Sequence, residues 1–322
     1  MKDRISNLAR RARREYSNKG LRSFIANGFR FVARDFWLEK LVDRRSISQS
    51  ELRNLAAEEG EIWYMPEEDP IRISQPSHPE LQEEIDAYPS KYSPERPFVC
   101  ELQDCHILGK YAVGTTNDGK IITETAPVYK NGSIKKLGIS PKQYLRISGM
   151  KTKGTEKKEM GLVFPLVTPY SSYYHWVMEY LPKIRMLERY IRETGNKPTI
   201  LVEPEPRSFI RESLETIGYF PPSYEEWRGN EAYVDRLIVP SHRLHLFDYY
   251  DPPSSNYNPS RDDLRWLRQR VRSGTEQNKK EEERIYISRQ EVGSKHTSSR
   301  SVVNYDEIGN ILDDFGFDSY VL

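Results

Sequence analysis

The stretch that decides the fold is residues 161–202, GLVFPLVTPYSSYYHWVMEYLPKIRMLERYIRETGNKPTILV. It opens with an apolar run, Gly161–Val167, which is typical of a buried strand. Apolar residues then recur with helical spacing over Tyr173–Glu193, and Pro182 should kink or divide this helix because proline has no N–H to donate. A second apolar run, Thr199–Val202, follows the helix. The order strand, helix, strand predicts a parallel βαβ unit.

Strands and helices continue to alternate after this unit. Their expected bounds are helix Ser208–Gly218, strand Tyr233–Val239, helix Ser260–Arg272, strand Arg284–Ser288, helix Tyr305–Phe315 and strand Asp318–Leu322, with a polar linker over 273–283. Such alternation predicts an α/β fold whose parallel sheet is covered by helices on both faces. We expect residues 161–240 to form a parallel βαβαβ sheet, in which Gly161–Val167, Thr199–Val202 and Tyr233–Val239 pair with one another in parallel.

The chain before residue 161 has a different character. Short β-type runs and turn signals occur between residues 98 and 129, and residues 149–159 are typical of an exposed loop. The runs are Phe98–Leu102, His106–Leu108, Tyr111–Thr115, Ile121–Glu124 and Pro127–Tyr129. Residues 46–97 are rich in Glu, Pro and Ser, which predicts an irregular segment.

Charge is distributed unevenly along the chain. Residues 1–45 carry 13 basic and 5 acidic side chains, which makes this arm +8 and leaves −7 on the rest. Apolar clusters between the cations favour amphipathic helices, which either bind an anionic membrane surface, pack on the body of the protein or stay solvated. Nucleic acid is not favoured as a partner, because no recognition motif accompanies the charge.

Composition excludes several classes of protein. The 322 residues are 37% hydrophobic and 30% charged, which excludes wholesale disorder. No apolar run approaches the roughly 18 residues that cross a bilayer, and the N-terminus lacks the apolar stretch of a secretory signal. Two cysteines, Cys100 and Cys105, cannot form a disulfide scaffold. A cytoplasmic location is expected, and the arm leaves a peripheral position at the inner face of the membrane open.

The richest cluster of chemical groups lies at the start of the helix predicted over Tyr173–Glu193. His175 and Glu179 are four residues apart and therefore share one helical face, where a carboxylate can orient a histidine that acts as a base. The same pair can instead stabilise the start of a helix. The spacing also suits two metal ligands, but no third ligand is close in sequence, so no metal is predicted.

A second cluster follows the strand Arg284–Ser288. Arg289, Arg300 and Asn304 belong to a basic stretch that leads to the helix Tyr305–Phe315. A strand end, a basic loop and a helix N-terminus together suit a phosphate group, which arginine can bind through two hydrogen bonds. A solvated basic loop is the alternative. The chain lacks a GxGxxG or P-loop motif, an Asp-x-Asp pair and a Gly-x-Ser-x-Gly elbow.

Five stretches of the chain follow one another in a specific order and spacing. They are Phe98–Glu124, which ends in NDGKIITE, YYHWVMEYLP at 173–182, RLIVPS at 236–241, RIYISR at 284–289 and RSVVNYDE at 300–307. In order and spacing, these stretches resemble glycosyltransferase family 61, known also from capsular-polysaccharide biosynthesis proteins.

The resemblance implies an inverting, metal-independent transferase of the two-Rossmann (GT-B-like) type, and no cofactor is predicted. A nucleotide-sugar donor would bind mainly in the C-terminal half and a glycan acceptor mainly in the N-terminal half. Arg289 and Arg300 would offset the charge of the donor diphosphate. His175 and Glu179 would face the cleft between the domains, and one of them would be the catalytic base. The other substrate-binding residues predicted from these stretches are Tyr174, Trp176, Asn304 and Glu307.

Three parts are expected along the chain. Residues 1–50 form the basic arm, residues 51–255 an N-terminal α/β domain that is first β-rich and then βαβ, and residues 256–322 the start of a C-terminal Rossmann domain. The family continues past the strand that matches Asp318–Leu322, so the second domain is expected to be incomplete. We interpret the chain as a truncated member (a partial gene, a fragment or a decayed copy) that does not transfer sugar by itself. The alternative is a non-catalytic glycan-binding or assembly module.

Overall fold

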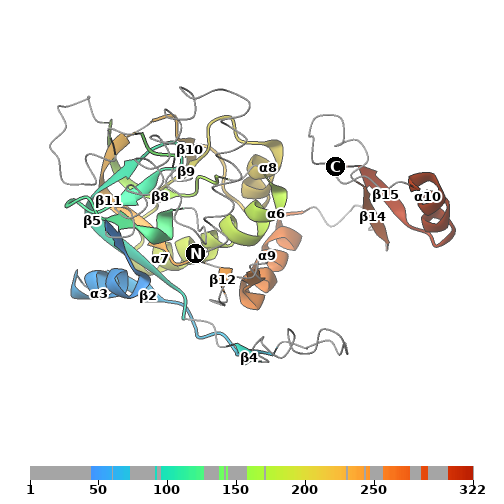
Figure 1. Ribbon diagram of the computed structural model, residues 1–322, viewed down its shortest axis with the longest axis horizontal. Coiled ribbons are helices and arrows are strands. Elements are labelled where there is room, and N and C mark those ends of the chain that lie inside the picture. Colours follow the sequence, from blue (N-terminus) through green and yellow to red (C-terminus); the bar gives the residue numbers. More distant parts are fainter. Residues whose placement is uncertain are drawn as a thin grey trace, which may run out of the picture. The chain divides into compact units, whose positions relative to one another are not determined.

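The computed structural model describes residues 45–59, 61–72, 91–92, 96–126, 138–140, 143, 158–169, 172–229, 231–242, 244–246, 257–275, 284–288 and 304–321. The chain forms two compact units, Met1–Gly274 and Thr275–Leu322 (Figure 1). Residues 1–44 of the predicted basic arm lie outside the described residues. No helix in the part of the chain that the structure describes has the length and apolar character needed to cross a bilayer.

A mixed sheet forms the centre of the first unit. Over the described residues it has nine strands, in the order β10-β9-β8-β11-β5-β6-β7-β1, with β2 paired to β5. The strands span β1 Ser46–Ile47, β2 Ile62–Tyr64, β5 Phe98–Leu108, β6 Val113–Thr115, β7 Ile121–Ile122, β8 Lys158–Pro165, β9 Thr199–Val202, β10 Tyr224–Glu226 and β11 Glu231–Pro240. Two small ribbons pair β3 Ile71–Arg72 with β4 Lys91–Tyr92 and β12 Leu244–Leu246 with β13 Tyr257–Pro259.

The predicted parallel pairing is confirmed. β8 pairs in parallel with β9 on one side and with β11 on the other. A short strand that the sequence pattern does not predict, β10, extends the sheet in parallel beyond β9. Numbered in chain order, the four parallel strands of β10-β9-β8-β11 lie in the order 3-2-1-4, so the winding direction reverses between β8 and β11. Open α/β sheets bind ligands beyond the carboxyl ends of the strands at such a switch point.

β5 joins this parallel half to an antiparallel half. It pairs antiparallel with β11 along its length and with β6 near its end. The two predicted runs Phe98–Leu102 and His106–Leu108 are parts of this single strand. The predicted run Pro127–Tyr129 lies outside the described residues.

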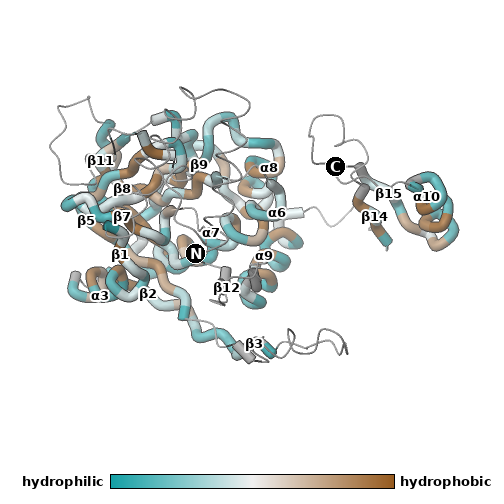
Figure 2. Tube along the Cα trace, in the orientation of Figure 1, coloured by the Kyte–Doolittle hydropathy of each residue, from teal (hydrophilic) through white to brown (hydrophobic). Residues whose placement is uncertain are grey.

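Helices cover both faces of the sheet in the first unit. They span α3 Gln49–Glu59, α6 Tyr173–His175, α7 Lys183–Thr194, α8 Ser208–Thr216 and α9 Arg261–Gly274, with a π-helical turn at Trp176–Tyr180 and a 3₁₀ turn at Thr123–Thr125. α7, α8 and α9 share one core with Phe164 of β8, and α3 shares the other core with Val163 of the same strand. Successive strand residues point to opposite faces, and Figure 2 shows the resulting hydrophobic segments along β8 and β9.

α3 corrects the expectation that residues 46–97 are irregular throughout. The helix begins with a capping box: the Glu51 N–H donates to Ser48 Oγ at 3.3 Å, and the Ser48 N–H donates to Glu51 Oε2 at 2.7 Å. Its apolar face, which includes Leu52 and Ala56, is fully buried. The Ser-x-x-Glu signal stands in the sequence, but the surrounding Glu, Ser and Pro residues obscure it.

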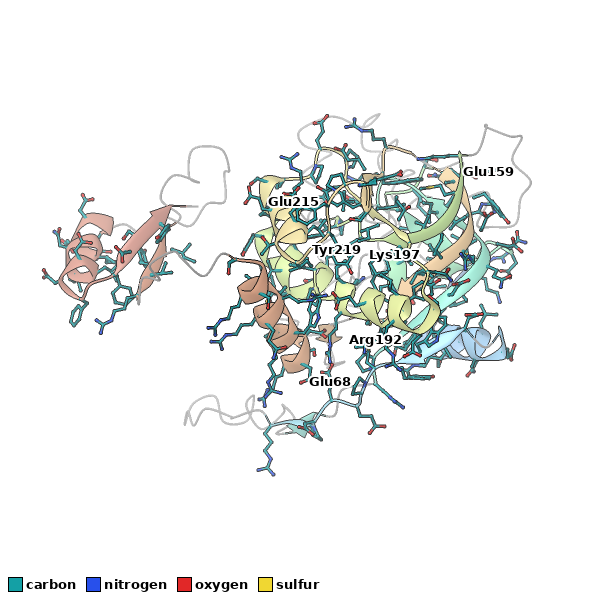
Figure 3. The ribbon with its side chains drawn as sticks, turned by 180° about the vertical axis from the view of Figure 1, so that it is seen from behind. Glu68, Glu159, Arg192, Lys197, Glu215 and Tyr219 are labelled. Atoms are coloured by element: carbon teal, nitrogen blue, oxygen red, sulfur yellow. The ribbon has the colours of Figure 1, made fainter. Side chains whose placement is uncertain are left out.

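α9 is tied to the first unit at its N-terminus. Ser260 Oγ accepts the N–H of Asp263 at 3.1 Å, which confirms the predicted helix start, and donates to Glu68 Oε1 at 2.8 Å. Figure 3 labels Glu68 on the segment that approaches α9. Asp263 is buried and accepts a hydrogen bond from Arg185 of α7 at 2.8 Å. α9 therefore packs with the first compact unit.

The second unit is a small parallel βαβ arrangement. β14 (Ile285–Ser288) pairs in parallel with β15 (Asp318–Val321), and α10 (Tyr305–Asp314) connects them. This agrees with the predicted strand, helix and strand. Several large apolar side chains of the unit are exposed, namely Ile285, Ile287, Ile311, Phe315 and Tyr320. The whole chain is thus a mixed α/β protein.

Candidate active site

The helix predicted over Tyr173–Glu193 is divided, as Pro182 indicates. A short α-helical turn is followed by the π-helical turn Trp176–Tyr180, and α7 begins directly after the proline. The N–H of Leu181 donates to the carbonyl of Trp176 at 2.8 Å, five residues back. Such π-turns are frequent at functional sites.

His175 and Glu179 are in contact across this turn. His175 Nδ1 lies within hydrogen-bond distance of Glu179 Oε1. The exposed fractions of the two side chains are 28% and 13%, so both reach the surface. An ionised carboxylate can only accept a hydrogen bond, so the contact places the ring proton on Nδ1 and the lone pair on Nε2. This is the form in which a histidine acts as a general base.

The ionisation of Glu179 depends on its surroundings. Burial raises the pKa of Glu179, whereas the hydrogen bond with His175 and the positive charge of Lys183 lower it. The neighbouring groups therefore favour the carboxylate that orients His175, against the cost of burying a negative charge.

Lys183, the first residue of α7, is buried beside this pair and is only 6% exposed. Its ammonium lies 5.0 Å from the centre of the Tyr180 ring. Burial lowers the pKa of Lys183 to about 8, while the carboxylates of Glu124 and Glu179 act to raise it. A cation with two acidic neighbours thus stands at the start of the helix.

Glu124 comes from a distant segment, the 3₁₀ turn after β7, and is 2% exposed. The backbone N–H of His242, just beyond β11, donates to Glu124 Oε2 at 2.6 Å. His242 Nε2 lies 3.0 Å from the carbonyl oxygen of Thr123, so this ring donates from Nε2. Burial lowers the pKa of His242, and the charge of Glu124 opposes this effect. Two segments that are far apart in sequence therefore meet at Glu124, and the charge of Lys183 acts on both Glu124 and His242.

A further carboxyl group stands at the end of β9. Glu203 follows the last residue of the strand, and its Oε2 is buried with no hydrogen-bond partner among the described residues. Burial raises the pKa of Glu203 to about 7, although a hydrogen bond from the Thr168 backbone lowers it. Thr168 itself follows β8, so the two residues mark the carboxyl ends of neighbouring parallel strands.

Comparison with known proteins decides the family. A family model described as Glycosyltransferase 61 matches residues 173–321. Residues 173–321 belong to glycosyltransferase family 61. No curated protein sequence matches the chain. The matched range begins with α6 and contains His175, Glu179, Lys183 and His242, whereas Glu124 precedes it.

The two aromatic residues that were predicted to bind the substrate, Tyr174 and Trp176, differ in their exposure to solvent. Tyr174 is 47% exposed, and its ring stands edge-on to the His175 ring with centroids 5.5 Å apart. Trp176 is completely buried, and its Nε1–H donates to Ser213 Oγ of α8 at 2.8 Å. In this conformation Trp176 offers no surface to a ligand and instead attaches the π-helical turn to α8.

A second exposed aromatic residue lies next to Tyr174. Tyr173 is 56% exposed and packs edge-on against Phe209 of α8, with centroids 5.4 Å apart. Two tyrosine rings thus flank the histidine of the glycosyltransferase domain on its N-terminal side. Exposed aromatic faces of this kind are suited to amphipathic ligands, because each ring combines an apolar face with a polar edge.

The other predicted substrate residues belong to the second unit or are not described. Arg289 and Arg300 lie outside the described residues. Asn304 and Glu307 are exposed at the start of α10, where Asn304 Nδ2 donates to Glu307 Oε2 at 3.4 Å. Their part in donor binding stays a prediction. Within the described ranges, no group of three or more His, Cys, Asp or Glu side chains is arranged to hold a metal ion.

Three residues of the cluster were not predicted from the sequence. Lys183 continues the four-residue spacing of His175 and Glu179, which is a signal, but it stands beyond Pro182, where the helix was expected to break. Glu124 is the last residue of the first family-like stretch, and His242 directly follows the third. Only the tertiary fold brings these positions to the same place.

Proposed function

We propose that this protein transfers a sugar from a nucleotide-sugar to a hydroxyl group of a glycan acceptor, with inversion and without a metal ion. The observation that carries the proposal is the His175–Glu179 contact in a family 61 domain, at the helix that follows β8. This helix leaves the sheet at the switch point between β8 and β11. The absence of an Asp-x-Asp pair from the sequence supports metal independence.

In the proposed reaction, His175 Nε2 takes the proton of the acceptor hydroxyl while the acceptor oxygen attacks the anomeric carbon. The bond between that carbon and the phosphate oxygen breaks, and the nucleoside diphosphate leaves. Glu179 stabilises the imidazolium that forms, because its carboxylate accepts the hydrogen bond from Nδ1–H. Arg289 and Arg300 are proposed to offset the charge of the leaving diphosphate.

Transfer can be tested with a panel of nucleotide-sugars and a mixture of oligosaccharide acceptors. Release of nucleoside diphosphate, with a product heavier by one sugar, supports the proposal, and the anomeric configuration of the product reports inversion. His175→Ala should abolish both signals. Arg192→Ala is the matched control, because Arg192 is exposed on α7 (Figure 3). Equal transfer by both variants, or dependence of transfer on added metal, would contradict the respective part of the proposal.

A second candidate function is glycan binding without catalysis. The exposed rings of Tyr173 and Tyr174 favour it, because aromatic faces can pack against the apolar face of a sugar ring. Calorimetric titration distinguishes the two functions: a transferase binds nucleoside diphosphates, whereas a binding module takes up oligosaccharides only. Tyr173→Ala should weaken oligosaccharide binding, and Phe220→Ala serves as the control because Phe220 is equally exposed elsewhere on the surface.

The basic arm is proposed to hold the transferase at an anionic membrane surface. Its net charge of +8 over residues 1–45 supports this, at about 1 kcal/mol per basic residue near such a surface. Co-sedimentation with anionic vesicles should be strong for the whole chain, weak for residues 46–322 and reduced by salt. Equal sedimentation of both proteins would reject the role of the arm.

A further inference from the structure

α9 carries four arginines along one side. Arg261, Arg265, Arg268 and Arg272 are four, three and four residues apart, a spacing that places them one above another on the same helical face. All four residues are exposed, whereas Leu267 on another face of the helix is buried in the core. The helix rises by 1.5 Å per residue, so this α9 arginine row is about 16 Å long, with roughly one cation per turn. α9 lies at the rim of the first unit (Figure 1).

The row is unfavourable for the helix itself. Cations three or four residues apart repel one another on a helix surface, and Arg261 stands in the first turn, where the helix dipole favours acidic side chains. Arg265 Nη1 lies 3.1 Å from Asp262 Oδ1, but the arginine side chain is 73% exposed, so this pair contributes little. Among the residues that the structure describes, Arg261 and Arg268 have no ion-pair or hydrogen-bond partner. An anionic partner outside the fold would explain the row.

α7, which packs beside α9, has the usual mixture of charges on its exposed side. Arg189 pairs there with Glu193 at 3.0 Å, four residues along the helix. α9 contains five arginines and two aspartates, and the aspartates occupy its first turn, where Asp263 is buried against Arg185. Beyond the first turn, every charged residue of α9 is an arginine. This uniform sign distinguishes the row from an ordinary solvated helix face.

The surroundings of the row indicate the kind of anionic partner. A membrane is a wide surface that would also meet the neighbouring elements, and outside residues 1–45 the chain carries a net charge of −7, which an anionic membrane repels. A single-stranded nucleic acid stacks its bases on exposed aromatic side chains. The aromatic residue of α9, Trp266, is instead partly buried and donates to Glu188 Oε2 at 3.2 Å. A linear polyanion without bases therefore fits the narrow row best.

The residue type indicates which anionic groups fit. The planar guanidinium of arginine binds a carboxylate or phosphate through two parallel hydrogen bonds, whereas the ammonium of lysine acts as a point charge. α9 contains arginine and no lysine. A polysaccharide that carries carboxylate or phosphate groups is a linear polyanion with the groups that arginine prefers. α9 also lies within the range 173–321 that matches the glycosyltransferase family.

We propose that the α9 arginine row binds the anionic polysaccharide chain to which the transferase adds a sugar, through carboxylate or phosphate groups away from the reacting hydroxyl. Such contacts help to hold a long acceptor in place. The row and the His175–Glu179 pair belong to the same compact unit, in which Arg270 of α9 pairs with Glu188 of α7. The proposal rests on the proposed function only in naming the bound chain as the acceptor, because binding to the row does not require transfer.

Calorimetric titration of the full chain with an oligomer of galacturonic acid tests the binding surface, and the methyl-esterified oligomer is the neutral control. The wild-type protein should bind the acid and not the ester. Replacing all four arginines of the row by glutamine should raise the Kd for the acid by about 30-fold, if each exposed ion pair contributes as such pairs usually do.

The matched control removes four exposed cations that do not belong to α9. Arg192 and Lys197 (Figure 3) are replaced by glutamine together with Arg207 and Arg211, so the net charge changes by the same amount. This variant should bind the galacturonic acid oligomer almost as tightly as the wild-type protein. Equal losses of affinity in the two folded variants would overturn the proposal.

Arginine modification locates the bound chain without interference from the basic arm. Phenylglyoxal reacts with exposed arginines, and peptide mass spectrometry reports the extent of reaction at each of them. The galacturonic acid oligomer should protect Arg268, whereas Arg192 should react as before. Protection of Arg268 by anionic vesicles or single-stranded DNA, but not by the oligomer, would overturn the proposal in favour of those partners.

An exchange of two residues within α9 separates the row from the net charge. Arg268→Ser with Ser273→Arg keeps the composition of the helix, and it moves one cation by about 140° around the helix axis. Both positions are exposed. The exchange should weaken binding of the oligomer as much as Arg268→Ser alone. Binding at the wild-type level would show that net charge suffices, and the proposal would be wrong.

A transfer assay distinguishes this proposal from the proposed function. With an anionic acceptor, the variant that lacks all four arginines should raise KM for the acceptor far more than it lowers kcat, because the contacts are away from the reacting atoms. If the row binds the oligomer but the protein transfers no sugar, the proposed function fails and the binding surface stands. If wild type and variant transfer sugar with the same KM, the acceptor role of the row fails and the transferase stands.

Discussion

Among the residues that the structure describes, two His–Glu pairs have opposite designs, namely His175–Glu179 and His242–Glu124. The first pair is local, since its members are four residues apart in sequence, and both side chains reach the surface. The second pair joins segments 118 residues apart, and its glutamate is 3% exposed. The hydrogen bonds place the ring proton on Nδ1 in His175 and on Nε2 in His242.

The two pairs show that residue type alone does not decide whether a His–Glu pair has a chemical or a structural role. In the first pair, the carboxylate orients a ring whose other nitrogen can take a proton. In the second pair, both the backbone and the ring of His242 are committed to the turn around Glu124. We interpret the first pair as chemical and the second as structural.

The largest expected effect on stability comes from Glu124→Ala. It leaves the His242 N–H without its buried acceptor and removes a negative charge that acts on buried Lys183, and this combined loss is expected to cost about 3–5 kcal/mol. Denaturant unfolding measures the loss. Glu193→Ala is the control, because Glu193 forms an exposed ion pair with Arg189 on α7 and should cost at most about 1 kcal/mol. Equal losses of unfolding free energy in the two variants would contradict the expected difference between buried and exposed interactions.

A smaller effect is expected for Ser213→Ala, which tests the hydrogen bond that attaches the π-helical turn of the first pair to α8. The change leaves the buried Nε1–H of Trp176 without its acceptor, which should lower the free energy of unfolding by about 1–3 kcal/mol. Sugar transfer per folded molecule should change little. A large loss of transfer with unchanged stability would instead support the substrate-binding role predicted for Trp176 from the sequence.

The pH dependence of stability should reveal the lowered pKa of His242. Its folded pKa is lowered by burial, so the unfolded chain binds more protons just below the ordinary value of 6.5. The free energy of unfolding should therefore fall as the pH drops through this range, and His242→Gln should flatten that fall. Thermal melting from pH 5 to 8 measures the difference. Identical pH profiles of variant and wild type would place His242 outside the buried cluster.

Glu203 should have the opposite effect on the pH dependence of stability. Its folded pKa of about 7 is above the ordinary 4.5, so its contribution to stability is present below 4.5 and is lost as the pH rises through 7. Glu203→Gln, which resembles the neutral acid, should raise the melting temperature at pH 8 and leave it unchanged at pH 4.5. Glu205→Gln, two residues away and exposed, serves as the control. A variant that melts below wild type at pH 8 would contradict this assignment.

Most of the parallel half of the fold could be predicted, because its apolar runs and helical periods are local signals. β8, β9 and β11 were expected in parallel, and they pair so. β10 was missed because it has only three residues, two of them glutamates. α3 was missed because its capping box stands in a stretch whose composition is typical of loops.

The candidate site likewise has one part that local sequence patterns predict and another part that they do not. The His175–Glu179 pair could be predicted from spacing, since four residues on a helix lie on one face. The convergence of Glu124, Lys183 and His242 depends on how β7, α7 and β11 pack, and no local pattern contains this information. Trp176 shows the converse: an aromatic residue in the most specific motif lies in the core.

The most direct test of the central claim measures turnover and melting temperature for His175→Gln and His242→Gln with the same donor and acceptor. We expect His175→Gln to lower kcat by about 10²–10⁴-fold with an unchanged melting temperature, as is typical for loss of a general base. His242→Gln should lower the melting temperature and reduce kcat per folded molecule far less. If His175→Gln loses stability in step with activity, or if His242→Gln shows the larger loss of kcat, the assignment of the two pairs is contradicted.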